Sequence, residues 1–173
     1  MITYLTGQII EYDILVEPKD VNLNLHSNIL NKLISKTEGK CNDIGYIIKD
    51  SVSILNKSNG KIKYINGKNI IVFKINYKCN ILKPSVGETI KCCIENITDA
   101  GVVAYVKLKD IDESFKQDND IQDAPVICII PLNRFKNVND LTRNQRLNVK
   151  ISAVRNKLNQ NNIQIVGTPV WKK

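Results

Sequence analysis

The chain carries the stretch Glu38–Ile48 (EGKCNDIGYII) between a pattern typical of a helix and a pattern typical of strands. Before this stretch, apolar residues recur at helical spacing from Leu25 to Ile34, which predicts a helix with one apolar face. Gly39 follows where a left-handed residue commonly ends a helix. Residues 44–54 predict a strand. The stretch is therefore interpreted as a turn that joins a helix to a sheet.

Strand patterns on both sides of the turn predict a small sheet that the helix covers. A first strand is predicted at Ile9–Val16, and Pro18 ends it because proline cannot donate a hydrogen bond to a neighbouring strand. Further strands are predicted at residues 60–72 and 73–84. The turns at residues 56–60 and 66–69 contain Asn-Gly, which is typical of tight hairpins.

After Pro84 and Gly87 the pattern consists mainly of strands. Five are predicted, at residues 88–97, 102–108, 125–130, 146–155 and 162–167, with a short helix near residues 133–141. Five strands with a helix between the third and the fourth favour an OB-fold barrel of the type found in a repeated ribosomal RNA-binding module. The predicted fold class is α+β, with an N-terminal α/β domain at residues 1–82 and an OB-fold domain at residues 83–173.

Composition favours a folded protein without a metal or cofactor. The chain is 43% hydrophobic and 24% charged, close to the average for globular domains. It has no apolar run long enough to span a membrane and no signal-peptide pattern at its start, so an intracellular location without membrane contact is expected. Five cysteines without Cys-x-x-Cys spacing and the single His26 predict reduced thiols and no zinc site.

The charge distribution favours a polyanionic partner. The net charge is +8, and excess lysine and arginine favour nucleic acid because their binding releases counterions. Residues 109–124 form an exception, since this stretch holds six acidic residues. The acidic residues are Asp110, Asp112, Glu113, Asp118, Asp120 and Asp123. The rest of the predicted barrel is strongly basic.

The stretch 38–48, the strand that ends at Glu17-Pro18 and the strand Ile75–Pro84 resemble the seventh subunit of eukaryotic RNA polymerase II and its archaeal counterpart. The resemblance runs from about Leu15 to Tyr105 and continues beyond it only as an order of strands. It implies a non-catalytic stalk subunit of DNA-directed RNA polymerase. Such a subunit docks on the polymerase core near the clamp, often beside a small helical stalk partner, and guides nascent RNA during transcription.

The composition, rich in isoleucine, asparagine and lysine, suggests that this is a version carried by a large DNA virus. The expected location is then the virion and the host cytoplasm, and for a cellular version the nucleus. The alternative function is a free-standing OB-fold RNA-binding protein of translation or RNA decay. A third alternative is an accessory domain of an enzyme.

The resemblance also implies which residues dock on the polymerase. The docking residues are Glu38, Gly39, Lys40, Cys41, Gly45 and Tyr46. The turn is one residue shorter here than in typical cellular relatives, at Asn42–Ile44. The alternative interpretation is an ordinary turn after the end of a helix.

The predicted nucleic-acid contacts lie on the barrel. Strand alternation after Gly101 predicts that Tyr105 and Lys107 point outward, where Tyr105 would stack on bases and Lys107 would contact phosphate. The loop at residues 155–162 contributes Arg155 and Lys157 for backbone contacts, and its alternative interpretation is a solvated hairpin. Binding to single-stranded RNA is expected to be weak and driven by the backbone. No catalytic residues are predicted.

Overall fold

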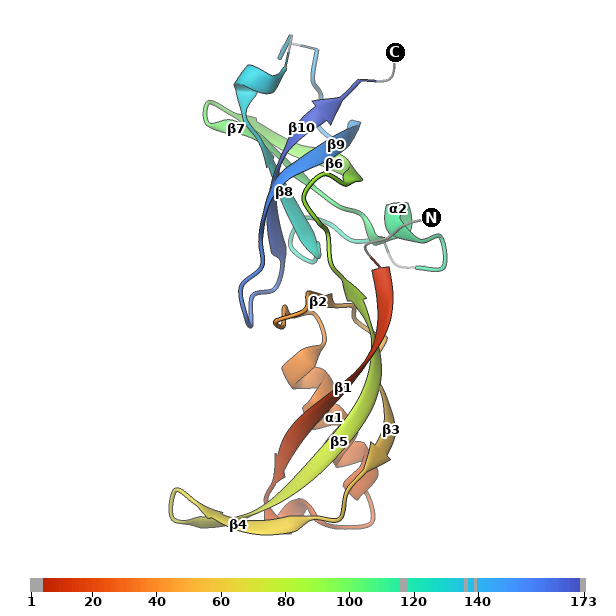
Figure 1. The fold of residues 1–173 in the computed structure, drawn as a ribbon, viewed down its shortest axis with the longest axis vertical. Coiled ribbons are helices and arrows are strands. Elements are labelled where there is room, and N and C mark those ends of the chain that lie inside the picture. The colour runs from red at the N-terminus through yellow and green to blue at the C-terminus, as the bar shows by residue number, and fades with distance from the viewer. Residues whose placement is uncertain (1–4, 116–117, 136, 139, 172–173) are drawn as a thin grey trace.

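The structure is a computed structural model that describes residues 5–115, 118–135, 137, 138 and 140–171. It is mostly β, with a twisted sheet and one helix in the N-terminal half and a closed barrel in the C-terminal half (Figure 1). No helix in these ranges is long and apolar enough to cross a membrane.

Strand β5 (Lys68–Leu82) is the centre of the N-terminal sheet, and every other strand of that sheet pairs with it in the antiparallel sense. On one side β1 (Leu5–Val16) pairs along its whole length, from Leu5 opposite Leu82 to Val16 opposite Ile71. The other side carries β2 (Tyr46–Ile47), β3 (Ser53–Lys57) and β4 (Lys61–Ile65). A single turn of 3-10 helix, η1 (Pro18–Asp20), follows β1.

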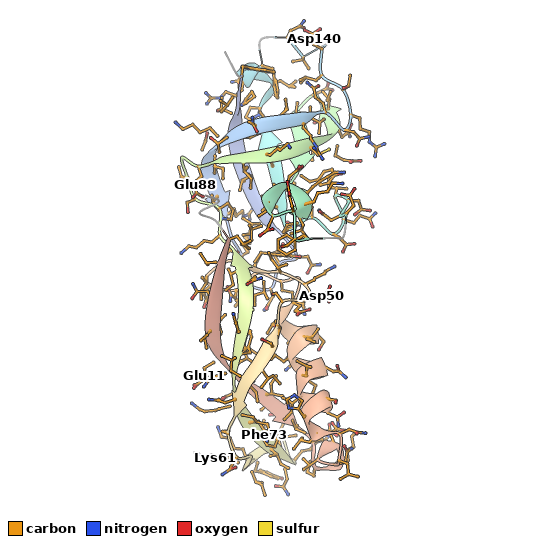
Figure 2. The ribbon with its side chains drawn as sticks, turned by 90° about the vertical axis from the view of Figure 1, so that its right-hand side faces the viewer. Glu11, Asp50, Lys61, Phe73, Glu88 and Asp140 are labelled. Carbon is orange, nitrogen blue, oxygen red and sulfur yellow. The ribbon has the colours of Figure 1, made fainter. Side chains whose placement is uncertain are left out.

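Helix α1 (Leu25–Thr37) covers one face of the sheet, as Figure 2 shows from the side. Its Ile29 and Leu33 are fully buried and pack in one cluster with Ile14 and Ile75 of the sheet. The helix ends before Gly39, whose φ of 70° is the left-handed conformation that the sequence predicts there.

The predicted strand at residues 44–54 is wrong, because the chain turns between β2 and β3. Asp50 has a φ of 60°, and the Glu38 carboxylate accepts hydrogen bonds from the backbone N–H groups of Asp50 and Val52, both at 3.0 Å. A strand cannot continue through that geometry. The predicted tight turn at Asn66-Gly67 is present, since both residues have positive φ, 50° and 79°, and join β4 to β5.

The C-terminal half is a closed barrel of five strands, and its outline agrees with the prediction. The strands are β6 (Thr89–Thr98), β7 (Gly101–Tyr105), β8 (Val126–Ile130), β9 (Arg146–Arg155) and β10 (Ile163–Val170). They close in the order β6-β7-β8-β10-β9, with β8 and β10 parallel, which is consistent with an OB-fold.

The helical parts of the barrel half differ from the prediction. Strand β7 ends at Tyr105, three residues before the predicted end, and a short helix α2 (Leu108–Ile111) begins the stretch that was predicted as a loop. The helix predicted at residues 133–141 is wrong for the described part of that range, which holds only the end of a 3-10 turn, η2 (Leu132–Arg134). Residues 136 and 139 of that range lie outside the described residues. Pro131 precedes this turn, and asparagine, a weak helix former, is frequent after it.

Two main clusters of buried side chains stabilise the fold. One lies between α1 and the sheet. The other fills the barrel and also takes in Cys41, Tyr46, Ile48 and Leu82 from the N-terminal half. The core of the barrel therefore extends into the N-terminal half at the point where the two halves meet.

Candidate docking turn and nucleic-acid interface

The turn at residues 38–46 lies between the sheet and the barrel. Cys41 and Tyr46 are each only 2% exposed and belong to the core cluster of the barrel. Burial raises the pKa of Cys41 to about 11 and that of Tyr46 to about 12. Both groups are therefore protonated near neutral pH and serve as packing groups at the junction.

The glycines and the glutamate of this turn have structural roles in the junction. A Cβ at Gly45 would lie 2.4 Å from the carbonyl oxygen of Leu82, so only glycine fits against β5 there. Gly39 ends α1. Glu38 ties the end of α1 to residues 50 and 52. The ammonium group of Lys40 donates a hydrogen bond to the Ser35 carbonyl at 2.8 Å.

Backbone hydrogen bonds join this turn to the loop between β9 and β10. The N–H of Cys41 donates to the Gln160 carbonyl at 2.8 Å, and the N–H of Asn159 donates to the Cys41 carbonyl at 2.9 Å. The Asn156 amide adds a bond to the Asn42 carbonyl at 2.8 Å. The structure thus brings together the turn predicted to dock and the loop predicted to contact RNA.

Several of the predicted docking residues make contacts within the chain. The side chains of Cys41 and Tyr46, two of the predicted docking residues, face the barrel, and the Gly45 backbone lies against β5. The exposed apex of the turn is formed by Asp43 and Ile44. In this conformation a partner would meet these two residues rather than the buried side chains. Docking by this turn stays a prediction.

Two of the residues predicted to bind nucleic acid, Tyr105 and Arg155, lie on the outer side of the barrel strands. Tyr105 on β7 lies beside Ile127 on β8, which lies beside Gln164 on β10, which lies beside Arg155 on β9. One lateral row therefore joins Tyr105 and Arg155 across three strand spacings, roughly 14 Å. The predicted alternation in β7 is correct, because Val102, Ala104 and Val106 point into the barrel core.

Tyr105 points out of the barrel but is not exposed, which corrects its predicted role as a stacking platform. Its side chain is 4% exposed and forms a small cluster with Cys93 and Ala124. Burial raises its pKa to about 12. Stacking on a base needs an open ring face, which Tyr105 lacks in this conformation.

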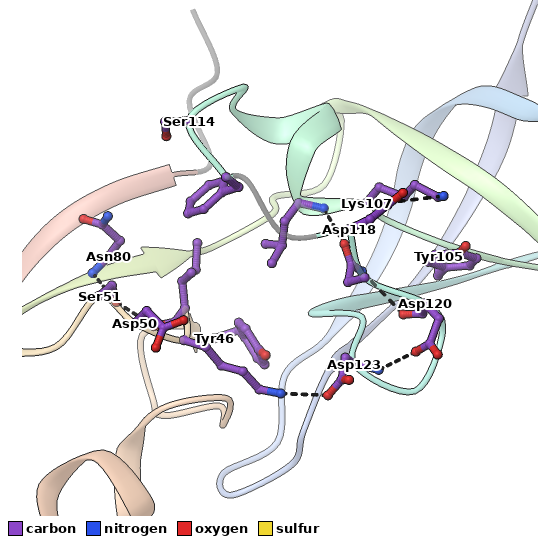
Figure 3. A pocket seen from close by; sticks show the side chains of 15 residues that line it. Tyr46, Asp50, Ser51, Asn80, Tyr105, Lys107, Ser114, Asp118, Asp120 and Asp123 are labelled. Carbon is purple, nitrogen blue, oxygen red and sulfur yellow. Dashed lines mark hydrogen bonds and ion pairs between the residues drawn. The ribbon is translucent and has the colours of Figure 1, made fainter. Parts of the chain in front are cut away.

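Lys107 is also engaged within the chain. Its ammonium group lies 3.5 Å from an Asp118 carboxylate oxygen and 5.9 Å from the centre of the Tyr105 ring, and its side chain is 19% exposed. Lys107 and Asp118 lie at the edge of a cavity of about 690 Å³ between the two halves (Figure 3). Tyr46 and Asp50 line it from one half, and Phe115 and Asp123 from the other.

Arg155, at one end of the row, and Lys157, in the loop that follows it, are accessible cations. Both are exposed, and neither forms an ion pair with an acidic group in the described part of the chain. With Gln160, Asn162 and Gln164 they line a small polar depression of about 90 Å³. Guanidinium, ammonium and amide groups together bind phosphate and sugar without reading sequence.

Gln164 is the residue of this depression that sequence reasoning missed. Its place on the outer face follows from alternation in β10, where Ile163 and Ile165 are buried. Its neighbour Arg155 lies on β9, and only the pairing of β9 with β10 brings the two together. No cluster of three or more potential metal ligands occurs among the described residues.

Comparison with known proteins yields two matches of the same kind. No protein-family model matches the chain. It is 32% identical over 97 residues to "DNA-directed RNA polymerase II subunit rpb7" of Dictyostelium discoideum, covering 55% of this chain and 54% of the relative. It is 24% identical over 96 residues to "DNA-directed RNA polymerase II subunit RPB7" of Glycine max, covering 56% and 53%.

The aligned part of the chain spans about half the length of these curated relatives. Both relatives are the same subunit of the same polymerase, from two distant eukaryotes. The predicted resemblance is thereby confirmed: over a little more than half of its length, this chain is similar to the seventh subunit of RNA polymerase II.

Proposed function

We propose that this chain is a non-catalytic stalk subunit of a DNA-directed RNA polymerase, with an N-terminal half that docks on the core and a barrel that contacts nascent RNA. The observation that carries this proposal is the similarity of more than half of the chain to two named polymerase II subunits. The closed barrel with an unpaired cationic loop supports the RNA contact, because such barrels commonly bind single strands.

The docking surface that we infer is the end of the sheet farthest from the barrel. There β4 and residues 68–70 of β5 extend past Val16, the end of β1, as a two-stranded ribbon (Figure 1). Ile62 and Tyr64 on one face of that ribbon are each 75% exposed. Figure 2 shows Lys61 at this far end of the molecule. An exposed apolar face on a ribbon of two strands is typical of a protein interface.

Co-purification tests this proposal. A tagged chain should elute with the large polymerase subunits at equal stoichiometry, and I62D/Y64D should lose them while its melting temperature stays near that of the wild type. Val86→Asp is the matched control, because Val86 is 64% exposed but lies in the link to the barrel. Elution of the wild type without any polymerase subunit would instead favour a free-standing RNA-binding protein.

The RNA contact is tested with a labelled 20-nucleotide oligouridine, titrated between about 50 and 200 mM salt. Arg155→Gln with Lys157→Gln should weaken binding and lower the salt slope by about 0.7 for each phosphate that is no longer neutralised. Lys36→Gln with Lys78→Gln removes the same charge from exposed sites in the other half and should leave the slope nearly unchanged. Equal effects of the two double variants would contradict a localised contact at the hairpin.

A further inference from the structure

Tyr105 is buried by a segment of its own chain. The acidic segment comprises residues 109–115 and 118–124; it begins within α2 and leads to β8. Figure 3 shows its Asp118 and Asp120 on the same side of the pocket as Tyr105, the last residue of β7. Ala124 and Ile121 of the segment pack against Tyr105 and Cys93. The segment therefore covers the end of the lateral row that lies opposite Arg155.

The same segment pairs with the cations around Tyr105. Asp118 lies 2.7 Å from the Lys109 ammonium group and 3.5 Å from that of Lys107. Asp110, at the start of the segment, lies 3.2 Å from the Lys91 ammonium group and 3.5 Å from the Arg146 guanidinium. Carboxylates and phosphates both pair with lysine and arginine, so these carboxylates occupy cations that a phosphate could otherwise pair with.

A buried amide anchors the segment to the barrel. Asn119 is 8% exposed, and its side chain accepts a hydrogen bond from the Leu108 N–H at 2.7 Å and donates one to the Val106 carbonyl at 3.1 Å. Asp123, farther along, pairs with Lys49 of the N-terminal half at 2.7 Å. Together with Asp110 at its start, the segment is thus bonded to the rest of the protein at its start, its middle and its end.

We propose that the acidic segment is an internal substitute for a polyanion: it occupies the Tyr105 end of the barrel face and confines RNA to the hairpin end at Arg155 and Lys157. The inference rests on the proposed RNA contact. Its physical basis is that counterions leave the RNA when a lysine neutralises one of its phosphates. A lysine that is already paired with a carboxylate can neutralise a phosphate only by giving up that partner, so it contributes less to binding and to the salt slope. Freeing those lysines enlarges the binding surface toward Tyr105.

Asp118→Asn is the decisive variant, because it frees Lys107 and Lys109 together. Binding of the oligouridine should strengthen several-fold near 50 mM salt, and the salt slope should steepen by up to about 1.4, or 0.7 for each lysine. Glu113→Gln is the matched control: it removes the same charge from the same segment, and the exposed Glu113 forms no ion pair with a described cation. It should change the slope little.

A double variant tests whether the stronger binding comes from the freed lysines or only from the loss of a negative charge. Adding Lys107→Gln to D118N should remove about half of the increase in salt slope that D118N produces.

The accessibility of Cys93 gives a second measurement. The other four cysteines belong to the two main cores, whereas Cys93 lies under the acidic segment. Its labelling by a thiol reagent, measured against C93S, should be faster in D118N than in E113Q.

The possible outcomes distinguish this inference from the proposed function. If D118N and E113Q bind oligouridine with equal salt slopes and their Cys93 is labelled at the same rate, the proposal that the acidic segment substitutes for a polyanion is wrong. The hairpin contact would still stand if the Arg155 and Lys157 variant had reduced affinity. Conversely, suppose that D118N binds RNA more strongly than the wild type and loses part of that increase when Lys107→Gln is added. That result supports the inference even if the variant at Arg155 and Lys157 binds RNA as the wild type does.

Discussion

Gly45 shows how a single residue holds the junction together. Its Cα lies so close to β5 that any side chain would meet the Leu82 carbonyl oxygen. The residue that the resemblance implied for docking is thereby explained by packing within the chain. The neighbouring Tyr46 and Cys41 are explained in the same way, by burial against the barrel.

We expect Gly45→Ala to destabilise the protein by roughly 1–3 kcal/mol, the usual range for overpacking, since the new Cβ would lie 2.4 Å from a backbone oxygen of β5. The measurement is the free energy of unfolding in urea. Gly7→Ala is the control, because a Cβ at Gly7 would have no neighbour nearer than 3.8 Å. A variant at Gly45 as stable as the control would show that the turn can move away from β5.

At the scale of elements, the hairpin between β9 and β10 is coupled to the turn at residues 38–46. Two of the connecting hydrogen bonds use backbone atoms, which substitution does not remove easily. The third uses the Asn156 amide and the Asn42 carbonyl and is open to a direct test.

Asn156→Ala should lower stability by about 0.5–1.5 kcal/mol, the net contribution of an ordinary hydrogen bond. Asn161→Ala is the matched control, because Asn161 is an exposed asparagine of the same loop for which no side-chain hydrogen bond is found among the described residues. The comparison is made by thermal unfolding. Identical melting temperatures for the two variants would mean that water replaces the Asn42 interaction at no cost.

Sequence patterns predict the elements well where a local rule decides them. β9 begins and ends at the predicted residues, and alternation in β7 gives the correct inward set. The patterns do not predict that Tyr105 is covered, because its burial depends on Ala124 and Ile121, which return to it through a long connection. The patterns also do not predict that the chain turns after β2. That turn depends on the Glu38 carboxylate, which is remote from Asp50 and Val52 in the sequence.

On the scale of the whole molecule, the two halves share a hydrophobic core. Cys41, Tyr46, Ile48 and Leu82 from the N-terminal half belong to the cluster that fills the barrel. A boundary near residue 82 stays a prediction, and a cut there would expose those apolar side chains to water. Separate stability of the halves is therefore not expected.

We predict a single cooperative unfolding transition. The melting curve followed by circular dichroism at the helical wavelength, which reports α1, should coincide with that followed by fluorescence of Trp171, which contacts Phe135 at the barrel with ring centres 6.3 Å apart. Tyr46→Ala should lower the melting temperature by the same amount in both measurements. Two separated transitions, with only one shifted by Tyr46→Ala, would show that the halves unfold independently.

Strand β5 spans the N-terminal half from the exposed ribbon to the junction. Its 15 residues correspond to about 50 Å of extended chain. If the ribbon rests on the polymerase, this strand is a ruler that sets how far from the enzyme surface a transcript first meets the hairpin. A one-residue insertion would turn the buried face of the strand outward unless a bulge absorbed it, so this distance is most easily lengthened in steps of two residues.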